Sequence, residues 1–166
     1  ILVHGRGASA QNMLGLAHEL YHPDFAYLAP QAAGHTWYPY SFLAPLEQNE
    51  PFLSSALALL DSVVDQVSAA GIPSERLMIV GFSQGACLAV EFAARRPRRY
   101  GGIVAFTGGL IGPDDTPRDY PGSLEGTPVF LGTSDPDPHV PRARVEESAR
   151  VLEGMGARVT LRIYPG

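Results

Sequence analysis

The strongest constraint on the fold is the sequence around Ser83, where a short apolar run meets an alanine-rich segment. Residues 77–80 read Leu-Met-Ile-Val, and a bounded run of this kind is typical of a strand buried on both faces. From residue 86 to residue 94, apolar side chains recur at helical spacing. The pattern therefore predicts a strand, a sharp turn and a helix, with Ser83 at the turn.

The turn carries a glycine on each side of Ser83, at positions 81 and 85. Glycine removes the Cβ atoms that would clash where the helix crosses the strand. The serine hydroxyl is then left above the sheet, where it can act as a nucleophile. A Gly-x-Ser-x-Gly sequence can arise by chance in a glycine-rich chain. The interpretation of Ser83 as a nucleophile therefore depends on the strand expected before it and the helix expected after it.

Three motifs occur in the order known from one family. They are His4-Gly5-Arg6-Gly7, Gly81-Phe82-Ser83-Gln84-Gly85-Ala86 and Asp137-Pro138-His139-Val140-Pro141. With them the chain resembles the α/β-hydrolase fold, and specifically the phospholipase/carboxylesterase family that includes acyl-protein thioesterases. The resemblance covers essentially the whole chain and implies a serine hydrolase that needs no cofactor.

Strands and helices alternate along the chain. We expect strands over residues 1–3, 25–29, 77–80, 103–106, 129–131 and 159–164, and helices over 9–21, 52–70, 86–94 and 142–155. This alternation predicts an α/β protein with a mostly parallel sheet and helices on both faces. Functional loops of such sheets gather at the carboxyl ends of the strands, near the point where strand order reverses.

The composition is that of one globular domain. Of the 166 residues, 45% are hydrophobic and 17% are charged, and the net charge of −5 argues against nucleic acid as a partner. No apolar stretch approaches the ~20 residues of a membrane span and no signal peptide is visible, so we expect a cytoplasmic protein. Cys87 is the only cysteine. Its place four residues after Ser83 suggests a small core residue rather than a nucleophile.

We expect the single domain, residues 1–166, to lack parts of the family's fold. The first three residues, Ile-Leu-Val, have no initiator methionine and already read as a buried strand. N-terminal strands are therefore expected to precede them. The resemblance also places the loop with the catalytic histidine, and a further helix, beyond Gly166.

Ser83 is the expected nucleophile. In this fold the oxyanion hole consists of two backbone N–H groups, here those of Gln84 and of Arg6. Only the backbone of Arg6 is required for this role. The alternative for residues 4–7 is an ordinary strand-to-helix connection whose glycines serve steric purposes.

The triad acid should follow a later strand, where Asp135 and Asp137 are two candidates. The family pattern favours Asp137, but this loop is two residues longer than the common family spacing, so Asp135 stays open. The other aspartate would be a turn residue. His139 is the only histidine after Ser83, and it lies too close to the acid to be the base. We therefore expect the base within about ten residues after Gly166.

Aromatic side chains are concentrated within residues 34–43, in a long loop without periodicity. Two interpretations are open. The loop packs against the rim of the sheet, or it forms the wall of an acyl pocket in which Trp37, Tyr38 and Phe42 contact the substrate. The acidic residues elsewhere have no histidine or cysteine at ligand spacing, so we expect no metal.

These features predict a serine carboxylesterase that hydrolyses ester or thioester bonds of small to medium acyl substrates through an acyl-enzyme on Ser83. One alternative is a catalytically silent α/β-hydrolase fold that binds a small molecule. Another is a dienelactone-hydrolase-like enzyme, which would prefer a cysteine nucleophile. The presence of Ser83 and of a candidate acid argues against both. A homodimer is left open as the assembly.

Overall fold

A computed structural model describes all 166 residues. Its strands are β1 (Leu2–Val3), β2 (Met78–Phe82), β3 (Gly102–Phe106), β4 (Pro128–Asp135) and β5 (Arg158–Pro165). Its α-helices are α1 (Ala10–Glu19), α2 (Phe52–Ala69), α3 (Gln84–Arg95) and α4 (Arg142–Gly154). Short 3-10 helices cover Ala33–His35, Leu46–Asn49 and Ser74–Arg76.

The five strands form one parallel sheet in the order β1-β2-β3-β4-β5. Val80 of β2 pairs with Val104 of β3, which in turn pairs with Phe130 of β4. The parallel α/β architecture predicted from the sequence is confirmed, and β5 lies at an edge, as its alternating pattern indicates. The expected reversal of strand order does not occur within this chain, because each strand pairs with the next one in sequence.

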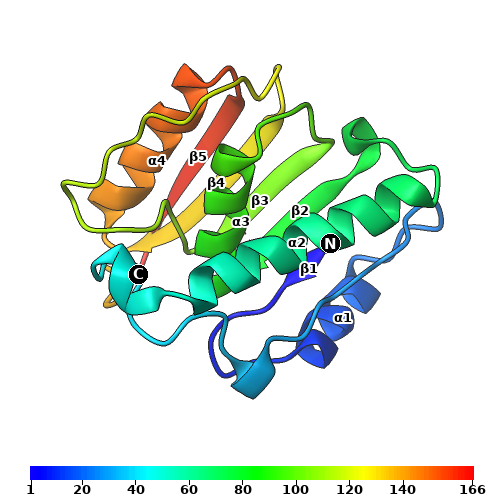
Figure 1. Ribbon diagram of the computed structural model, residues 1–166, viewed down its shortest axis with the longest axis horizontal. Helices are drawn as coiled ribbons and strands as arrows, with labels where there is room; N and C mark the ends of the chain where they lie inside the picture. Colours follow the sequence, from blue (N-terminus) through cyan, green and yellow to red (C-terminus); the bar gives the residue numbers. More distant parts are fainter.

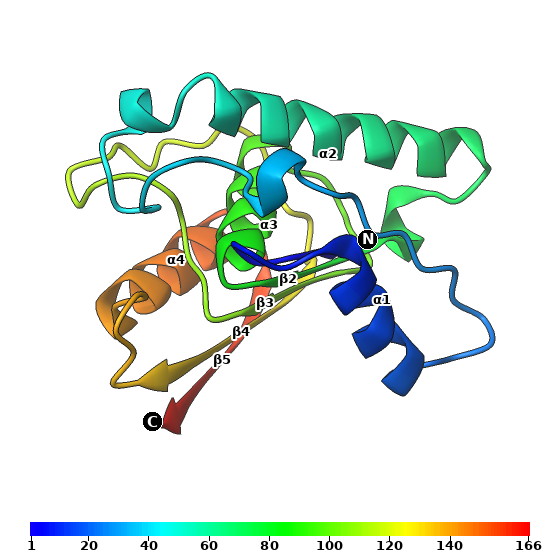
Figure 2. The same cartoon turned by 90° about the horizontal axis from the view of Figure 1, so that it is seen from below.

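The helices cover the sheet unequally. Figures 1 and 2 show α2, α3 and α4 on one face, with α1 on the other face beside β1. Packing agrees with this view, since α3 contacts β1, β2 and β3 while α4 contacts β4 and β5. The main core lies between these helices and the sheet, and a small separate cluster of Leu2, Met13 and Ala17 joins α1 to β1. Both faces therefore carry helices, as expected.

The strand expected over residues 25–29 does not form. This segment makes one backbone hydrogen bond to β1, from Leu2 N–H to the Leu28 carbonyl at 2.7 Å, where a strand would need a ladder of such bonds. Its conformation is held locally, because the Tyr27 hydroxyl donates to the Leu20 carbonyl and accepts from the His22 N–H. The β-propensity of a short run does not by itself produce a strand here.

Helix α2 is long and apolar enough to meet a minimal criterion for a membrane span, with a mean hydropathy of 1.2 over its 18 residues. Its buried side chains recur at helical spacing and belong to the main core: Leu53, Ala56, Leu57, Leu60, Val64 and Val67. An amphipathic core helix of a globular domain meets the same criterion.

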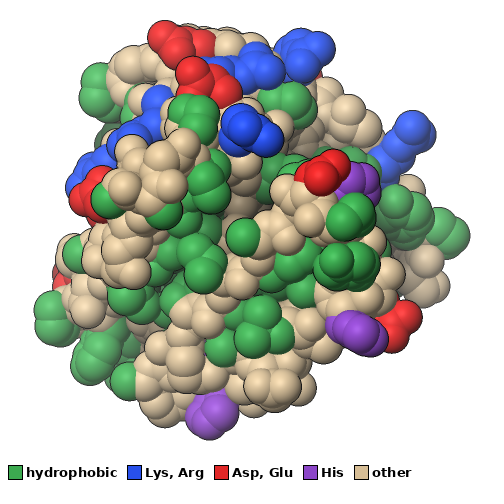
Figure 3. Space-filling view, turned by 90° about the vertical axis from the view of Figure 1, so that its right-hand side faces the viewer, with side chains coloured by type: hydrophobic (Ala, Val, Ile, Leu, Met, Phe, Trp, Pro, Cys, Tyr) green, Lys and Arg blue, Asp and Glu red, His purple; other side chains and the backbone are tan.

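Apolar side chains also reach the surface. Leu20, Tyr21 and Phe25, at the end of α1 and just after it, are each at least half exposed. The side view in Figure 3 shows hydrophobic side chains scattered over one face, with basic groups near its upper edge. Phe82, Phe106 and Tyr164 are exposed on the face of the sheet that carries α1, in the part that α1 does not cover.

Candidate active site

Ser83 occupies the one-residue connection between β2 and α3. Its backbone has φ 52° and ψ −117°, a combination that side-chain-bearing residues rarely adopt. The Ser83 N–H donates to the Phe106 carbonyl at 2.9 Å, and its carbonyl accepts from the Cys87 N–H at 3.0 Å. These two bonds hold the strained residue between β3 and α3. The junction predicted from the sequence is present in the structure.

The two flanking glycines allow the close contacts of this junction. A Cβ atom on Gly81 would lie 2.3 Å from the Gly85 carbonyl oxygen. A Cβ atom on Gly85 would lie 2.2 Å from the Val3 carbonyl oxygen. Side chains at either position would therefore drive α3 away from β1 and β2.

Ser83 opens onto a cleft of about 650 Å³ at the carboxyl ends of the strands. Its walls come from three segments. They are the loop after β1 (residues 4–9), the aromatic loop (residues 34–43) and the acid loop, which comprises the last residue of β4 and the loop after it (residues 135–141). The lining residues are Arg6, Tyr38, Pro39, Tyr40, Ser41, Phe42, Ser83, Gln84, Cys87, His139 and Val140. A cleft of this size can hold a small or medium-sized organic substrate.

The loop after β1 contains backbone N–H groups without an intramolecular acceptor, and that of Arg6 is one of them. Within it, the Gly7 N–H donates to the His35 carbonyl and the Ala8 N–H to the Gly5 carbonyl, whereas the Arg6 N–H has no acceptor. Gln84 is the first residue of α3, and the N–H groups of a first helical turn have no intrahelical partner. Arg6 and Gln84 thus both line the cleft with N–H groups of the kind an oxyanion hole requires.

His4 orders this loop and takes no part in the cleft. Its ring is fully buried, with Nδ1 2.8 Å from the Gly5 carbonyl oxygen and Nε2 3.1 Å from the Ala32 backbone nitrogen. A neutral imidazole with its proton on Nδ1 satisfies both contacts. The ring also packs against Trp37 at a centroid distance of 4.8 Å.

The three aromatic residues singled out by sequence are all buried, but they do not share one role. Tyr38 and Phe42 line the cleft, whereas Trp37 does not. The Trp37 indole N–H instead donates to the His4 carbonyl at 2.7 Å, inside the main core. Of the two open interpretations, packing fits Trp37, whose ring lies in the main core next to β1, while its contact with the substrate stays a prediction.

Burial changes the acid strength of two groups on the cleft floor. It raises the pKa of the Cys87 thiol to about 12 and holds the pKa of the Tyr38 hydroxyl well above its usual range. Both groups stay protonated near neutral pH. Cys87 is thus a neutral, fully buried core residue, which fits the prediction that it is not a nucleophile.

The two candidate acids differ in their surroundings. Asp137 Oδ1 accepts the backbone N–H groups of His139 and Val140, each at 2.8 Å. Asp135 is exposed and pairs with Arg142 at 3.3 Å. The carboxylate of Asp137 is therefore oriented by its own loop, which enters the cleft through His139 and Val140. Asp135 has an independent role as a surface ion-pair partner.

The family model described as Phospholipase/Carboxylesterase matches residues 1–166. The chain belongs to the phospholipase/carboxylesterase family. Its fold is the α/β-hydrolase fold, as the sequence analysis predicts.

Two curated relatives and one solved structure illustrate this membership. The chain is 31% identical over 117 residues to acyl-protein thioesterase 1 of Schizosaccharomyces pombe, covering 70% of this chain and 52% of the relative. It is 29% identical over 154 residues to acyl-protein thioesterase 1 of Yarrowia lipolytica, covering 81% of this chain and 68% of the relative. The chain spans about half the length of most curated relatives it matches.

The solved structure is a phospholipase/carboxylesterase from Dyadobacter fermentans. It is 51% identical with a TM-score of 0.96, and the match covers 99% of this chain and 79% of that chain. The backbone of this chain therefore follows the same path as that structure over nearly its whole length.

Sequence reasoning missed the side chain of Gln84 in this family member. Its amide is buried, and both its oxygen and its nitrogen bond to the aromatic loop. Oε1 accepts the Trp37 N–H at 2.9 Å, and Nε2 donates to the Tyr38 carbonyl at 2.8 Å. The residue after the nucleophile therefore also places Tyr38 on the cleft wall. No local sequence signal marks this contact, since 46 residues separate the partners.

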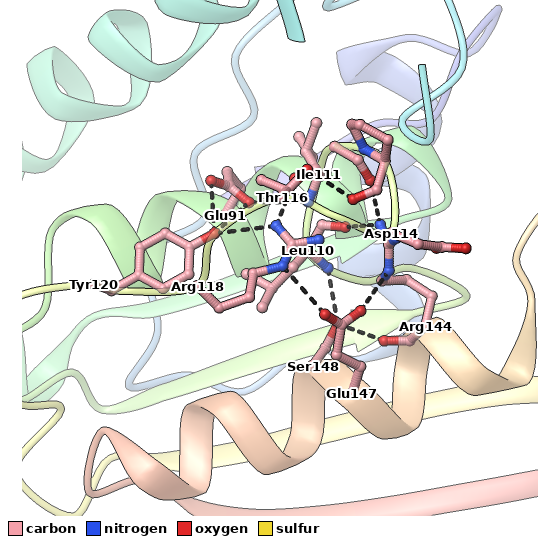
Figure 4. Close-up of polar contacts among 12 residues, drawn as sticks. Glu91, Leu110, Ile111, Asp114, Thr116, Arg118, Tyr120, Arg144, Glu147 and Ser148 are labelled. Atoms are coloured by element: carbon pink, nitrogen blue, oxygen red, sulfur yellow. Dashed lines mark hydrogen bonds and ion pairs between the residues drawn. The ribbon is translucent and has the colours of Figure 1, made fainter. Parts of the chain in front are cut away.

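The polar network behind Phe42 was also missed. Arg144 of α4 is buried, and its guanidinium donates to the carbonyls of Leu110 and Gly112 and to Asp114. Figure 4 shows it reaching from α4 into the loop that follows β3. The Gly112 N–H in turn donates to the Phe42 carbonyl at 2.7 Å. Helix α4 thus supports the cleft wall through this loop.

Proposed function

We propose that this protein is a serine hydrolase that cleaves carboxylic ester or thioester bonds of small to medium acyl substrates. The observation that carries the proposal is the backbone of Ser83, held at positive φ at the mouth of a cleft that also contains the N–H groups of Arg6 and Gln84. Strain of this kind at a cleft is typical of sites where it serves a mechanism. Membership of the family supports the same reaction.

In the proposed reaction, Ser83 Oγ attacks the carbonyl carbon of the substrate and transfers its proton to a histidine. The N–H groups of Gln84 and Arg6 stabilise the negative charge on the carbonyl oxygen. The tetrahedral intermediate expels the alcohol or thiol, which takes the proton from the histidine. Water, deprotonated by the same histidine, then hydrolyses the acyl-enzyme and regenerates Ser83.

Asp137 is the proposed acid that orients this histidine. Its Oδ1 atom accepts two backbone N–H groups, which fix the orientation of the carboxylate. Ionised Asp137 would keep the histidine in the correct tautomer. Asp135 is less suited, since it is already paired with Arg142.

We propose that the base is a histidine following Gly166. The end of β5 lies beside the acid loop, because the Gly166 N–H donates to the Asp135 carbonyl at 3.2 Å. His139 is the competing candidate, because it lines the cleft with Ser83. In the full-length protein, substitution of the base by glutamine should lower kcat on the order of 10⁴-fold or more, while the same change at the other histidine should not. The cytoplasmic location stays a prediction.

The test of the function is Ser83→Ala in the full-length protein, assayed on p-nitrophenyl acetate and on an acyl thioester. We expect kcat to fall on the order of 10⁴ to 10⁶-fold with unchanged circular dichroism, because a triad member acts as part of a unit. A fluorophosphonate probe should label the wild-type protein at Ser83 and leave the variant unlabelled. Activity within tenfold of wild type would sink the proposal.

A further inference from the structure

The Arg6 side chain is held in a defined place on the cleft wall. Its Nη1 donates to the Pro39 carbonyl at 2.8 Å and its Nη2 donates to the Tyr40 carbonyl at 2.7 Å. A guanidinium has five N–H donors in a rigid plane. These two bonds orient the group and leave the remaining donors available, although Arg6 itself is exposed.

The surroundings of Arg6 provide no counter-charge. No carboxylate lines the cleft, in a chain that has 17 acidic and 12 basic residues. Arg6 forms no ion pair, as is also true of six other arginines, while the remaining five each have an acidic partner: Arg95, Arg96, Arg118, Arg142 and Arg144. The only other cleft residue that can carry charge is His139, which is also basic. The cleft is thus positive in a protein with a net charge of −5.

We infer that the Arg6 side chain binds an anionic group of the substrate, a carboxylate or a phosphate. A planar guanidinium with free N–H groups matches these oxyanions, and its charge remains uncompensated until a ligand supplies the anion. The inference rests on the proposed function and narrows its substrates to esters that carry a negative charge. In the proposed reaction the backbone N–H of Arg6 also binds the oxyanion. The anionic group of the substrate should therefore lie within a few bonds of the scissile ester bond.

Two pairs of substrates distinguish where the charge is carried. For the acyl side, the mono-p-nitrophenyl ester of glutaric acid is compared with p-nitrophenyl pentanoate, which has the same number of acyl carbons. For the alcohol side, acetylglycerol phosphate is compared with acetylglycerol by acid release. The measured quantity is the ratio of kcat/KM for the charged ester to kcat/KM for the neutral ester, in the full-length protein.

We expect Arg6→Gln to lower this ratio at least tenfold in one of the two pairs, because the charge is lost while the backbone N–H is retained, and the loss of the bonds to Pro39 and Tyr40 affects the charged and the neutral ester alike. Arg6→Lys should retain part of the ratio. Arg150→Gln is the matched control, since Arg150 is an exposed arginine of α4 outside the cleft and its loss changes the net charge equally. In the wild-type protein, added NaCl should lower the ratio by screening Arg6.

The outcomes separate the two proposals. A wild-type protein that hydrolyses the neutral esters but shows no preference for either charged ester, or a ratio that is insensitive to both Arg6→Gln and salt, overturns the role of Arg6 alone. A wild-type protein that hydrolyses none of the four esters overturns the proposed function, and the role of Arg6 with it. If Arg6→Gln fails to fold, Arg6→Lys replaces it, and an unchanged ratio in that variant together with no effect of salt overturns the role of Arg6.

Discussion

The Gln84 side chain accepts the backbone N–H of Trp37 at 2.9 Å, so the first residue of α3 anchors the aromatic loop directly to the nucleophile junction. The Thr36 hydroxyl approaches the same oxygen at 3.3 Å. A single buried amide thereby couples the residue after Ser83 to the wall of the cleft.

Gln84→Ala should therefore damage the cleft while retaining its backbone N–H. Loss of the amide leaves the buried Trp37 N–H without a partner, at a cost of roughly 1–3 kcal/mol, whereas the Tyr38 carbonyl keeps the Thr36 hydroxyl as a donor at 3.0 Å. We expect a lower midpoint of urea unfolding and a higher KM. Gln84→Glu keeps an acceptor for Trp37 but buries a carboxylate with one oxygen against the Tyr38 carbonyl, so we expect it to be destabilised as well. If Gln84→Ala were as stable as wild type, the tether would have no energetic role.

The two aspartates of the acid loop should respond differently to amide substitution. Asp137→Asn retains an oxygen that can accept the N–H groups of His139 and Val140, so the loop should keep its shape. The lost charge should still lower kcat on the order of 10⁴-fold, because the histidine is no longer held in the correct tautomer. Asp135→Asn breaks an exposed ion pair with Arg142, and its kcat should stay close to that of wild type. Steady-state kinetics on both variants make the comparison, and the reverse order would assign the acid to Asp135.

Stability should fall at alkaline pH through Cys87. Burial raises the pKa of its thiol from 9.0 to about 12, so the folded state keeps a proton that the unfolded state releases above pH 9. The stabilisation is complete below pH 9 and decreases as the pH rises toward 12. Between pH 8 and pH 10 we expect wild type to lose about 1.4 kcal/mol more of its free energy of unfolding than Cys87→Ala.

Urea titrations of both proteins at these two pH values measure the difference directly. The other groups that titrate in this range are common to wild type and Cys87→Ala, including Tyr100 and Tyr120, whose pKa values burial raises to about 12. Tyr100 and Tyr120 therefore cancel in the comparison, whereas the hydroxyl of Tyr38, whose pKa Cys87 helps to raise, does not cancel fully. An equal pH dependence of the two proteins would show that the thiol ionises as easily in the folded state as in the unfolded chain.

Arg144 should be required for both stability and cleft shape. Arg144→Met leaves the carbonyls of Leu110 and Gly112 without their donor, and we expect a loss on the order of 3 kcal/mol in the free energy of unfolding. The guanidinium also lies 6.0 Å from the Phe42 ring, so KM should rise for longer acyl chains. Arg142→Met in the same helix removes only exposed ion pairs and should have a much smaller effect. Equal effects of the two substitutions would rule out a special role of the buried site.

Much of the fold was predictable because the chain carries strong local patterns. The apolar run before Ser83, the two glycines around it and the helical spacing after it specify a strand, a turn and a helix without reference to any distant residue. The same holds for α2, α4 and β5. Residues 25–29 show the limit of such patterns, because this apolar run makes only one backbone hydrogen bond to β1 and forms no strand.

The sequence by itself determined the parallel α/β architecture and the place of Ser83, since both depend on short-range periodicity and on backbone sterics. Tertiary structure alone decided which aromatic residues face the cleft, that Gln84 and Arg144 support its walls, and that Arg6 stands there without a carboxylate partner. Those contacts join residues about 30 or more positions apart. A side chain's partner at such a distance depends on how the helices pack on the sheet, and no local pattern encodes that packing.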